Sequence, residues 1–251
     1  QINYGIKTGF NDAFIINGEK KAELITQDPK SAEIIRPILR GRDIKRYGYE
    51  FADLYLLFIP WHFPLHLVEP EIKGASKEAE EAFENQYPAI YNHLLQYKTE
   101  LSNRNKAETG IRYEWYALQR WGANYWEDFS KQKIIWKIIG NELAFCIENG
   151  NFMINNACYL LTGNHLEYIV AFLNSKPIKW FSLQTNMNKT GVGDMQVGAQ
   201  NISLFPIPIP KAQYEQEIIN LLKISDYQKV EKLINEIYQL SEEEIIFIEK
   251  L

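Results

Sequence analysis

The sequence predicts an α+β fold: a mixed or antiparallel sheet core with packed helices and a helical C-terminal section. Short apolar runs rich in β-branched and aromatic residues recur between residues 13 and 161, and such runs are typical of strands. Residues 76–105 and 211–251 instead repeat apolar positions at steps of three and four, which indicates helices. We therefore expect an α+β domain over residues 1–210 and a helical section over 211–251 that packs on it or extends from it.

The first expected strands lie in the N-terminal quarter of the chain. The glycine-punctuated segment 5–9 predicts a turn, and the apolar run 13–16 after it predicts a strand. Residues 51–59 form a near-continuous apolar run that ends at Pro60, and this pattern is typical of a buried strand.

The middle of the chain predicts helices and then strands. Residues 76–105 are expected to form two helices, because Pro88 lacks the amide hydrogen that a continuous helix needs there. Residues 133–161 predict three strands, with a two-residue hairpin turn at Asn149-Gly150 between the second and the third.

The last third of the chain predicts helices around one polar loop. A helix is expected over 166–173, and Ser175 is expected to cap its successor. Residues 184–204 are rich in Gly, Asn, Gln and Thr and predict a long loop, a feature that is usually functional or mobile. Ser225 and Ser241 each precede Gln or Glu by three residues, which is the pattern of a helix capping box.

The charge of the chain is unevenly distributed. The formal net charge of -5 argues against nucleic acid as a partner when it is taken alone. Counted by segment, however, residues 1–50 carry +2 and residues 101–140 carry +3, whereas the segments 51–100 and 211–251 carry -5 and -4. Residues 36–46 form the tightest basic cluster, with five cations and one aspartate.

The sequence predicts a cytoplasmic protein that does not enter a membrane. No run of 18 apolar residues occurs, and the first twenty residues lack the zones of a signal peptide. The two cysteines, Cys146 and Cys158, are expected to be reduced and buried, as in cytoplasmic proteins. Because the chain opens with Gln1 on a structured-looking segment, we expect it to be a piece of a longer polypeptide.

Catalytic motifs are scarce, and we expect neither a catalytic centre nor a bound metal. No Gly-x-Gly-x-x-Gly turn and no Asn-Pro-Pro-Tyr segment occurs, and prolines interrupt any helix that would join His62 to His66 as zinc ligands. Asp53, Glu71 and Lys73 form the one nuclease-like pattern, in which two carboxylates and a lysine would hold magnesium. A standalone magnesium-dependent nuclease is therefore an alternative, although such a pattern arises easily by chance.

Binding of duplex DNA is better supported by the residue types. The cluster 36–46, the segment 112–121 and the polar loop 184–190 combine guanidinium, amide and aromatic groups. Arginine bridges the two major-groove acceptors of guanine, Asn and Gln bridge adenine, and lysine holds phosphates. A second alternative is a protein-interaction module in which the acidic helices of 211–251 dock a partner.

Five segments in order resemble one known family. These segments are Gly5-Ile-Lys-Thr-Gly-Phe-Asn-Asp-Ala-Phe-Ile15, Pro37-Ile-Leu-Arg-Gly-Arg-Asp-Ile-Lys-Arg-Tyr47, Lys131-Gln-Lys-Ile-Ile-Trp136, Leu173-Asn-Ser175, and Phe205-Pro-Ile-Pro-Ile-Pro210 with Glu215-Gln216. Together they resemble the TaqI-like C-terminal specificity domain, the target-recognition module of adenine-N6 DNA methyltransferases and type IIG restriction–modification enzymes. The last two also resemble the recognition domains of type I specificity subunits, which implies a similar fold.

The resemblance implies a division of labour between domains. Within this family a separate N-terminal methyltransferase domain binds S-adenosylmethionine and methylates a flipped adenine, and fused enzymes add a nuclease domain. The C-terminal domain clamps double-stranded DNA and reads its sequence. The chain would then be non-catalytic and hold no cofactor, and its partners would be double-stranded DNA and the methyltransferase domain of its parent chain.

Two sets of site residues follow from these considerations. Shared motifs mark scaffold and clamp, whereas the polar loops that differ between recognition modules read bases. The expected phosphate-binding residues are Arg40, Arg42, Lys45, Arg46 and Lys189. The candidates for base reading are Arg112, Arg120, Gln184, Asn186 and Asn188.

Overall fold

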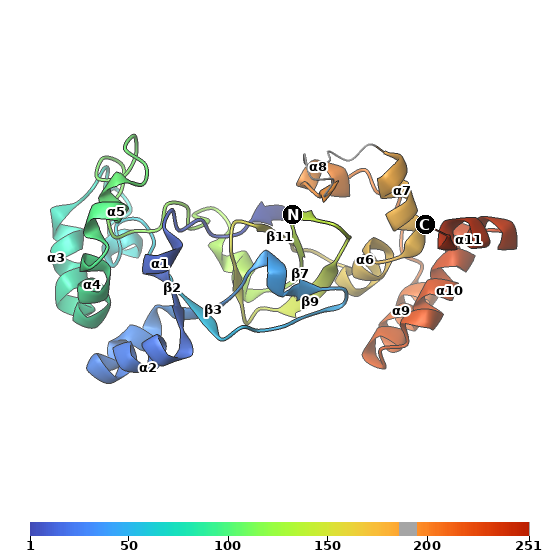
Figure 1. The fold of residues 1–251 in the computed structure, drawn as a ribbon, viewed down its shortest axis with the longest axis horizontal. Coiled ribbons are helices and arrows are strands. Elements are labelled where there is room, and N and C mark those ends of the chain that lie inside the picture. The colour runs from blue at the N-terminus through green and yellow to red at the C-terminus, as the bar shows by residue number, and fades with distance from the viewer. Residues whose placement is uncertain (186–194, 251) are drawn as a thin grey trace.

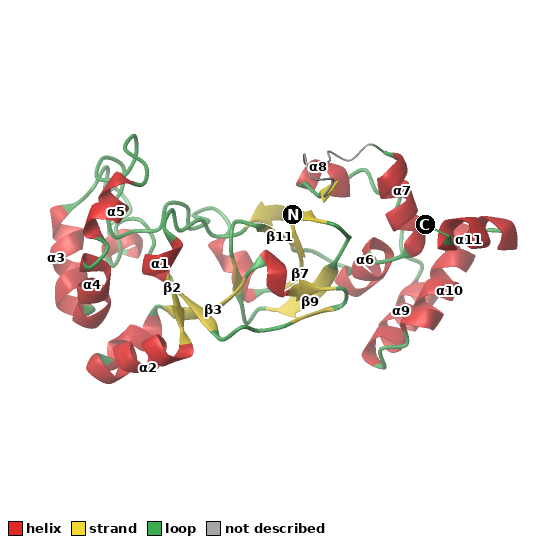
Figure 2. Ribbon diagram, viewed as in Figure 1, coloured by secondary structure: helices red, strands yellow, loops and turns green. Residues whose placement is uncertain are grey.

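Two four-stranded sheets form the centre of the molecule in a computed structural model that describes residues 1–185 and 195–250. Helices lie at both ends of the long axis, with α3–α5 at one end and α9–α11 at the other (Figures 1 and 2). This arrangement confirms the predicted α+β fold. No helix within the described ranges is long and apolar enough to cross a membrane.

The first sheet is antiparallel throughout. Its strand order is β1 (Ile2–Tyr4), β11 (Cys158–Leu161), β7 (Gln132–Lys137) and β9 (Phe145–Asn149). The strand β1 therefore lies at an edge, and β7 lies at the centre.

The second sheet is mixed. Its strand order is β10 (Met153–Ile154), β3 (Ile35–Leu39), β6 (Leu54–Leu57) and β2 (Ile15–Asn17), and β10 runs parallel to β3 while the other pairs are antiparallel. Two short ribbons complete the strands: β4 (Ile44–Lys45) with β5 (Gly48–Tyr49), and β8 (Ile139–Gly140) with β12 (Met195–Gln196).

The helices fall into three groups along the chain. The first group is α1 (Asn11–Phe14) and α2 (Gly18–Gln27), and the second is α3 (Lys77–Gln86), α4 (Pro88–Leu95) and α5 (Lys98–Asn103). The third is α6 (Leu166–Leu173), α7 (Lys176–Gln184), α8 (Ala199–Ile202), α9 (Ala212–Lys223), α10 (Tyr227–Tyr238) and α11 (Glu242–Glu249).

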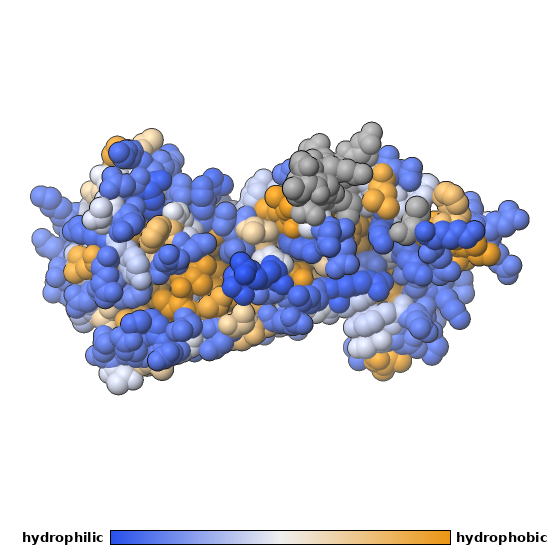
Figure 3. Space-filling model, viewed as in Figure 1, coloured by the Kyte–Doolittle hydropathy of each residue, from blue (hydrophilic) through white to orange (hydrophobic). Residues whose placement is uncertain are grey.

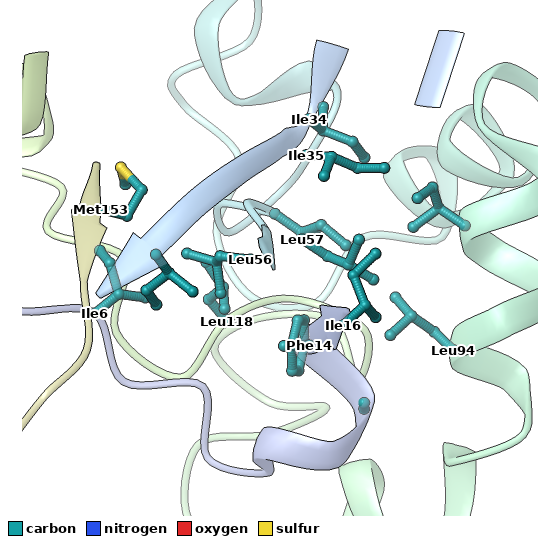
Figure 4. Packing of buried hydrophobic residues seen from close by; sticks show 14 of the residues in the cluster. Ile6, Phe14, Ile16, Ile34, Ile35, Leu56, Leu57, Leu94, Leu118 and Met153 are labelled. Atoms are coloured by element: carbon teal, nitrogen blue, oxygen red, sulfur yellow. The ribbon is translucent and has the colours of Figure 1, made fainter. Parts of the chain in front are cut away.

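Buried apolar side chains form three clusters between the sheets and the helices. The largest lies between the two sheets and reaches α4, and Figure 4 shows Leu56, Leu57 and Leu118 within it. A second cluster packs the other face of the first sheet against α6. A third joins α6 to α9 and α10, so those two C-terminal helices pack on the sheet-bearing part through α6. Whether 211–251 behaves as a separate unit stays a prediction.

The predicted hairpin at Asn149-Gly150 is wrong. The strand β9 before this turn pairs with β7, but the chain after it leaves the first sheet and joins β3 as β10. The segment 158–161 then returns to the first sheet on the other side of β7, so Cys146 faces Ile135 and not Met153. Both cysteines are free and buried.

The glycine in this turn is required by packing. Gly150 has φ +86°, a value that L side chains rarely adopt, and an added Cβ would lie 2.3 Å from the carbonyl oxygen of Ser130. The sequence therefore marks a tight turn correctly without specifying which strands it joins.

Most predicted helix boundaries are confirmed. Pro88 begins α4, Ser175 caps α7 by accepting a hydrogen bond from the Ile178 amide, and Ser241 forms a capping box with Glu244. The capping box at Ser225 is wrong, because Asp226 caps α10 instead.

Two segments differ in part from their predicted forms. The expected strand 13–16 is divided between α1 and β2, with the strand proper at Ile15–Asn17. The expected loop 184–204 contains α8 and the strand β12 within its described part.

Candidate nucleic-acid interface

The basic cluster 36–46 does not present all its cations in the same way. Arg40 is held at the start of a short 3-10 helix, Gly41–Asp43, where its guanidinium donates two hydrogen bonds to Asp43 at 3.0 and 2.8 Å. The same carboxylate accepts the Arg40 amide at 2.8 Å. Burial opposes ionisation of Asp43, but these contacts hold the pKa of Asp43 below its ordinary value. Arg40 thus rigidifies the cluster.

Lys45 and Arg46 also contact the protein. The Lys45 Nζ donates to the Arg42 carbonyl oxygen at 3.2 Å and lies 3.6 Å from Glu50. Arg46 donates through two nitrogens to the Asn174 carbonyl oxygen, at 3.1 and 2.9 Å, and faces Glu231 at 3.5 Å. These contacts tie the β4–β5 ribbon to α6 and α10.

Arg42 has fewer contacts than the other cations of this cluster, of which the exposed Arg36 donates to the Ile35 carbonyl oxygen at 3.3 Å. The Arg42 side chain is exposed, and within residues 1–185 and 195–250 it makes no ion pair, side-chain hydrogen bond or ring contact. The structure therefore distinguishes Arg42 from its neighbours as a free guanidinium.

Arg120, a predicted base reader, lies beside Lys7. The two residues form an antiparallel bridge, in which each amide donates to the carbonyl oxygen of the other at 2.9 and 3.0 Å. Side chains of residues paired in this way point to the same side. Neither side chain has a carboxylate partner among the described residues.

Main-chain contacts connect this pair to Arg42. Ile6, the neighbour of Lys7, donates to the Ile154 carbonyl oxygen at 2.8 Å, and the Asn155 amide donates to the Leu39 carbonyl oxygen at 3.1 Å. The segments that carry Arg120, Lys7 and Arg42 are therefore successive neighbours, with residues 154–157 between the last two.

Lys137 lies next to Gly41 and so adjoins the segment that carries Arg42. An added Cβ on Gly41 would lie 3.3 Å from the Lys137 Cβ, and Lys137 likewise has no carboxylate partner in the described parts of the chain. We call Lys7, Arg42, Arg120 and Lys137 the central basic stripe. These four cations stand on adjoining segments, and none of them forms an ion pair among the described residues.

The sequence alone did not single out Lys7 and Lys137 as ligands. Both stand in segments with a basic excess, 1–50 and 101–140, but no local motif distinguishes them from the other cations there. The bridge to Arg120 places Lys7, and the close approach to Gly41 places Lys137.

The remaining predicted readers are more scattered. Arg112 is exposed, lies 3.2 Å from Glu108 and faces the Trp61 ring at 5.7 Å. Gln184 is exposed at the end of α7. Asn186, Asn188 and Lys189 lie outside the described residues. None of these roles is tested by the arrangement of the chain, and all stay predictions.

The glycine motif at the N-terminus is scaffold. An added Cβ on Gly5 would lie 2.0 Å from the Asn155 carbonyl oxygen, and Gly9 has φ +79° beside the Arg104 side chain. Arg104 donates to the carbonyl oxygens of Thr8, Trp115 and Ala117, and burial lowers its pKa to about 10. It fixes the segments on which Lys7 and Arg120 stand.

The alternative hypotheses gain no support from the geometry. Asp53 accepts the Tyr55 hydroxyl at 3.0 Å beside Gly18, whereas Glu71 and Lys73 lie in the exposed turn before Gly74. No cluster of three or more His, Cys, Asp or Glu able to hold a metal occurs in the part of the chain that is described.

The surface is hydrophilic over most of the face in Figure 3, with apolar side chains gathered near the β2–β3 region and near α11. The acidic C-terminal helices α9 and α10 pack against α6 through their apolar residues.

Comparisons with known proteins agree on one family. The model of the TaqI-like C-terminal specificity domain matches residues 36–207, which is more than half of the chain. The Type II methyltransferase M.MjaIV of Methanocaldococcus jannaschii is 26% identical over 121 residues, which cover 48% of this chain and 35% of that protein. The chain therefore spans only part of this curated relative.

A solved structure has a similar fold. It is the Type IIL restriction–modification enzyme MmeI in complex with DNA, which matches with a TM-score of 0.64 and 15% sequence identity. The match covers 96% of this chain and 33% of that enzyme.

Proposed function

Because this chain belongs to the TaqI-like C-terminal specificity domain family, we propose that it is the duplex-DNA recognition domain of a restriction–modification methyltransferase. The relatives are a type II methyltransferase and a restriction–modification enzyme bound to DNA, each longer than this chain. The chain would read the target sequence, and catalysis would belong to other domains of the parent protein.

One observation carries the proposal: the central basic stripe. A protein surface normally pairs many of its cations with nearby carboxylates, as Lys45 and Arg112 are paired here. The four stripe cations have no such partner among the described residues, although the chain as a whole is acidic. DNA phosphates would supply the missing negative charge.

The roles divide between clamp and readers. Arg42, Lys7 and Lys137 would neutralise phosphates, as would Lys189, and Arg120 would reach a base edge from the same stripe. Arg112, Gln184, Asn186 and Asn188 complete the proposed readers. Arg40, Lys45 and Arg46 would contribute mainly through the internal contacts that fix the ribbon.

The parent protein is proposed to methylate adenine in the cytoplasm. S-adenosylmethionine would bind in its methyltransferase domain, since the present residues include no nucleotide-type cofactor turn. An endonuclease domain in the same parent would make it a type IIG enzyme.

The salt dependence of DNA binding tests the proposal. Binding of a fluorescein-labelled random-sequence duplex is measured by anisotropy as the salt concentration is varied. Each phosphate contact contributes about 0.9 to the slope of log K against log salt, so Arg42→Gln and Lys7→Gln should each reduce the slope by about 1.

The matched control is Lys223→Gln. Lys223 is exposed at the end of α9, outside the central basic stripe, and has no ion pair among the described residues. Its replacement should leave the slope unchanged. Equal slopes for all three variants, or no duplex binding by the wild-type chain, would refute the proposal.

A further inference from the structure

A ladder of aromatic rings crosses the first sheet and ends at its edge. Tyr4, Tyr159, Trp136 and Phe145 are successive register partners on β1, β11, β7 and β9. Their ring centroids are 4.3, 5.3 and 5.7 Å apart along the series. Cross-strand aromatic pairs of this kind hold side chains in fixed positions.

Only the first ring of the ladder is open to solvent. Tyr159, Trp136 and Phe145 are nearly or fully buried, whereas Tyr4 is 49% exposed. Tyr4 is therefore an aromatic side chain that is supported by Tyr159 and is half exposed to solvent. A supported ring loses little conformational entropy when a ligand packs on it.

Two predicted reader segments flank this ring. Lys7 lies three residues after Tyr4 on the same segment, and its main chain pairs with that of Arg120. On the other side Trp136 donates its indole N–H to the Val197 carbonyl oxygen at 2.9 Å. The segments around Arg120 and Val197 thus meet at the ladder.

The charge around the ring favours a nucleic acid over other aromatic ligands. Arg120 and Lys7, the stripe cations on this side, have no carboxylate partner among the described residues. An uncompensated guanidinium beside an exposed, supported ring matches the combination of a phosphate and an adjacent planar base.

We propose that Tyr4 is a base-contacting residue, and that the exposed part of its ring packs against a nucleobase of the bound duplex next to the phosphate held by Lys7. This inference rests on the proposed function and adds to it a contact that the charged residues do not supply. Since the contact carries no charge, it would strengthen binding without changing the salt slope.

The first test compares variants of Tyr4 on the 251-residue chain. The probe is a duplex selected from a random pool by the wild-type chain. Tyr4→Ala should weaken binding about ten-fold or more with an unchanged salt slope, because base–aromatic packing is worth roughly 1–3 kcal/mol. Tyr4→Phe keeps the ring and should retain most of the affinity. Phe247→Ala removes an exposed ring from α11 and should leave binding unchanged.

The second test locates the contact directly. Selected duplexes carrying 5-iododeoxyuridine are irradiated, and the protein is digested with trypsin. The peptide that ends at Lys7 contains Tyr4 as its one aromatic residue, so we expect a crosslink there that Tyr4→Phe retains and Tyr4→Ala abolishes. This readout does not depend on the stability of the alanine variant.

The outcomes separate the two proposals. If the wild-type chain retains the duplex but crosslinks only in other peptides and Tyr4→Ala binds as tightly as wild type, the Tyr4 assignment is overturned and the DNA-binding proposal stands. If the wild-type chain does not retain duplex DNA even at low salt, both are overturned.

Discussion

At the residue scale, the fully buried Lys133 and Glu148 form an ion pair with a structural role. Lys133 donates to Glu148 and to the Phe129 carbonyl oxygen, while Glu148 also accepts the amides of Gly150 and Asn151 at 3.1 and 2.7 Å. Burial lowers the pKa of Lys133, and the ion pair with Glu148 opposes that change. The pair fixes the turn by which the chain passes from the first sheet to the second.

Removing one partner should therefore be costly. Lys133→Met leaves a buried carboxylate without its countercharge, and we expect a loss of about 3–5 kcal/mol in the free energy of unfolding. Urea denaturation measures it. The double variant Lys133→Met with Glu148→Gln buries no lone charge and should recover part of the loss. A single variant as stable as wild type would contradict this account.

A buried histidine makes stability depend on pH. Burial lowers the pKa of His93, although its hydrogen bond to the Ala13 carbonyl oxygen, 3.0 Å long, opposes the change. The unfolded chain then binds a proton more readily than the folded chain, so stability falls as pH decreases below about 6.5. His93→Gln should make this decline shallower when unfolding is measured between pH about 7 and about 5. The pKa of His66 is also lowered by burial, so part of the slope should remain. Identical slopes in variant and wild type would exclude His93 as a source.

The same scale explains which site residues the sequence could identify. Arg42 and Arg120 stand in segments whose composition already suggests a ligand. No local motif distinguishes Lys7 and Lys137 in this way, and they join the stripe through the bridge to Arg120 and the close approach to Gly41. Composition also could not distinguish the role of Arg42 from that of Arg40. The geometry of a single turn decides that Asp43 accepts hydrogen bonds from the Arg40 guanidinium.

At the element scale, local patterns predicted elements better than their partners. Helix starts at Pro88 and Ser241 depend on neighbours within one turn, and both were predictable. The pairing of β10 with β3 joins segments more than a hundred residues apart and is decided by packing between two sheets. The Asn149-Gly150 turn motif does not specify with which strand the following segment pairs.

Glycine substitutions test this packing at the element scale. Gly5→Ala places a Cβ 2.0 Å from the Asn155 carbonyl oxygen, so backbone must shift where β1 leads into the central basic stripe. We expect a loss of about 1–3 kcal/mol in thermal or urea unfolding. Gly48→Ala is the matched control, because no atom lies within 4 Å of its added Cβ. Comparable losses at both positions would argue against a specific close approach at Gly5.

At the scale of the whole molecule, the β4–β5 ribbon fastens the C-terminal helices to the sheets. Arg46 reaches the Asn174 carbonyl oxygen and Glu231, and Tyr47 stacks on Tyr227 with ring centroids 4.3 Å apart and planes 1° from parallel. Arg42 and Arg46 of the basic cluster 36–46 therefore have different roles. Arg42 is exposed and makes none of these contacts, whereas Arg46 holds α6 and α10 in place.

This division gives a prediction that separates structural from ligand-binding cations. Arg46→Ala removes hydrogen bonds of a charged donor worth about 1–2 kcal/mol at a partly exposed site, so amide exchange over residues 212–249 should quicken by about ten-fold or more. Exchange in α3 and α4, at the other end of the long axis, should be unchanged, since Arg46 contacts Asn174 and Glu231. Arg42→Gln should show the reverse pattern: unaltered exchange, but a shallower salt dependence of DNA binding. Arg46→Ala with unaltered exchange and a reduced salt slope would instead identify Arg46 as a phosphate ligand.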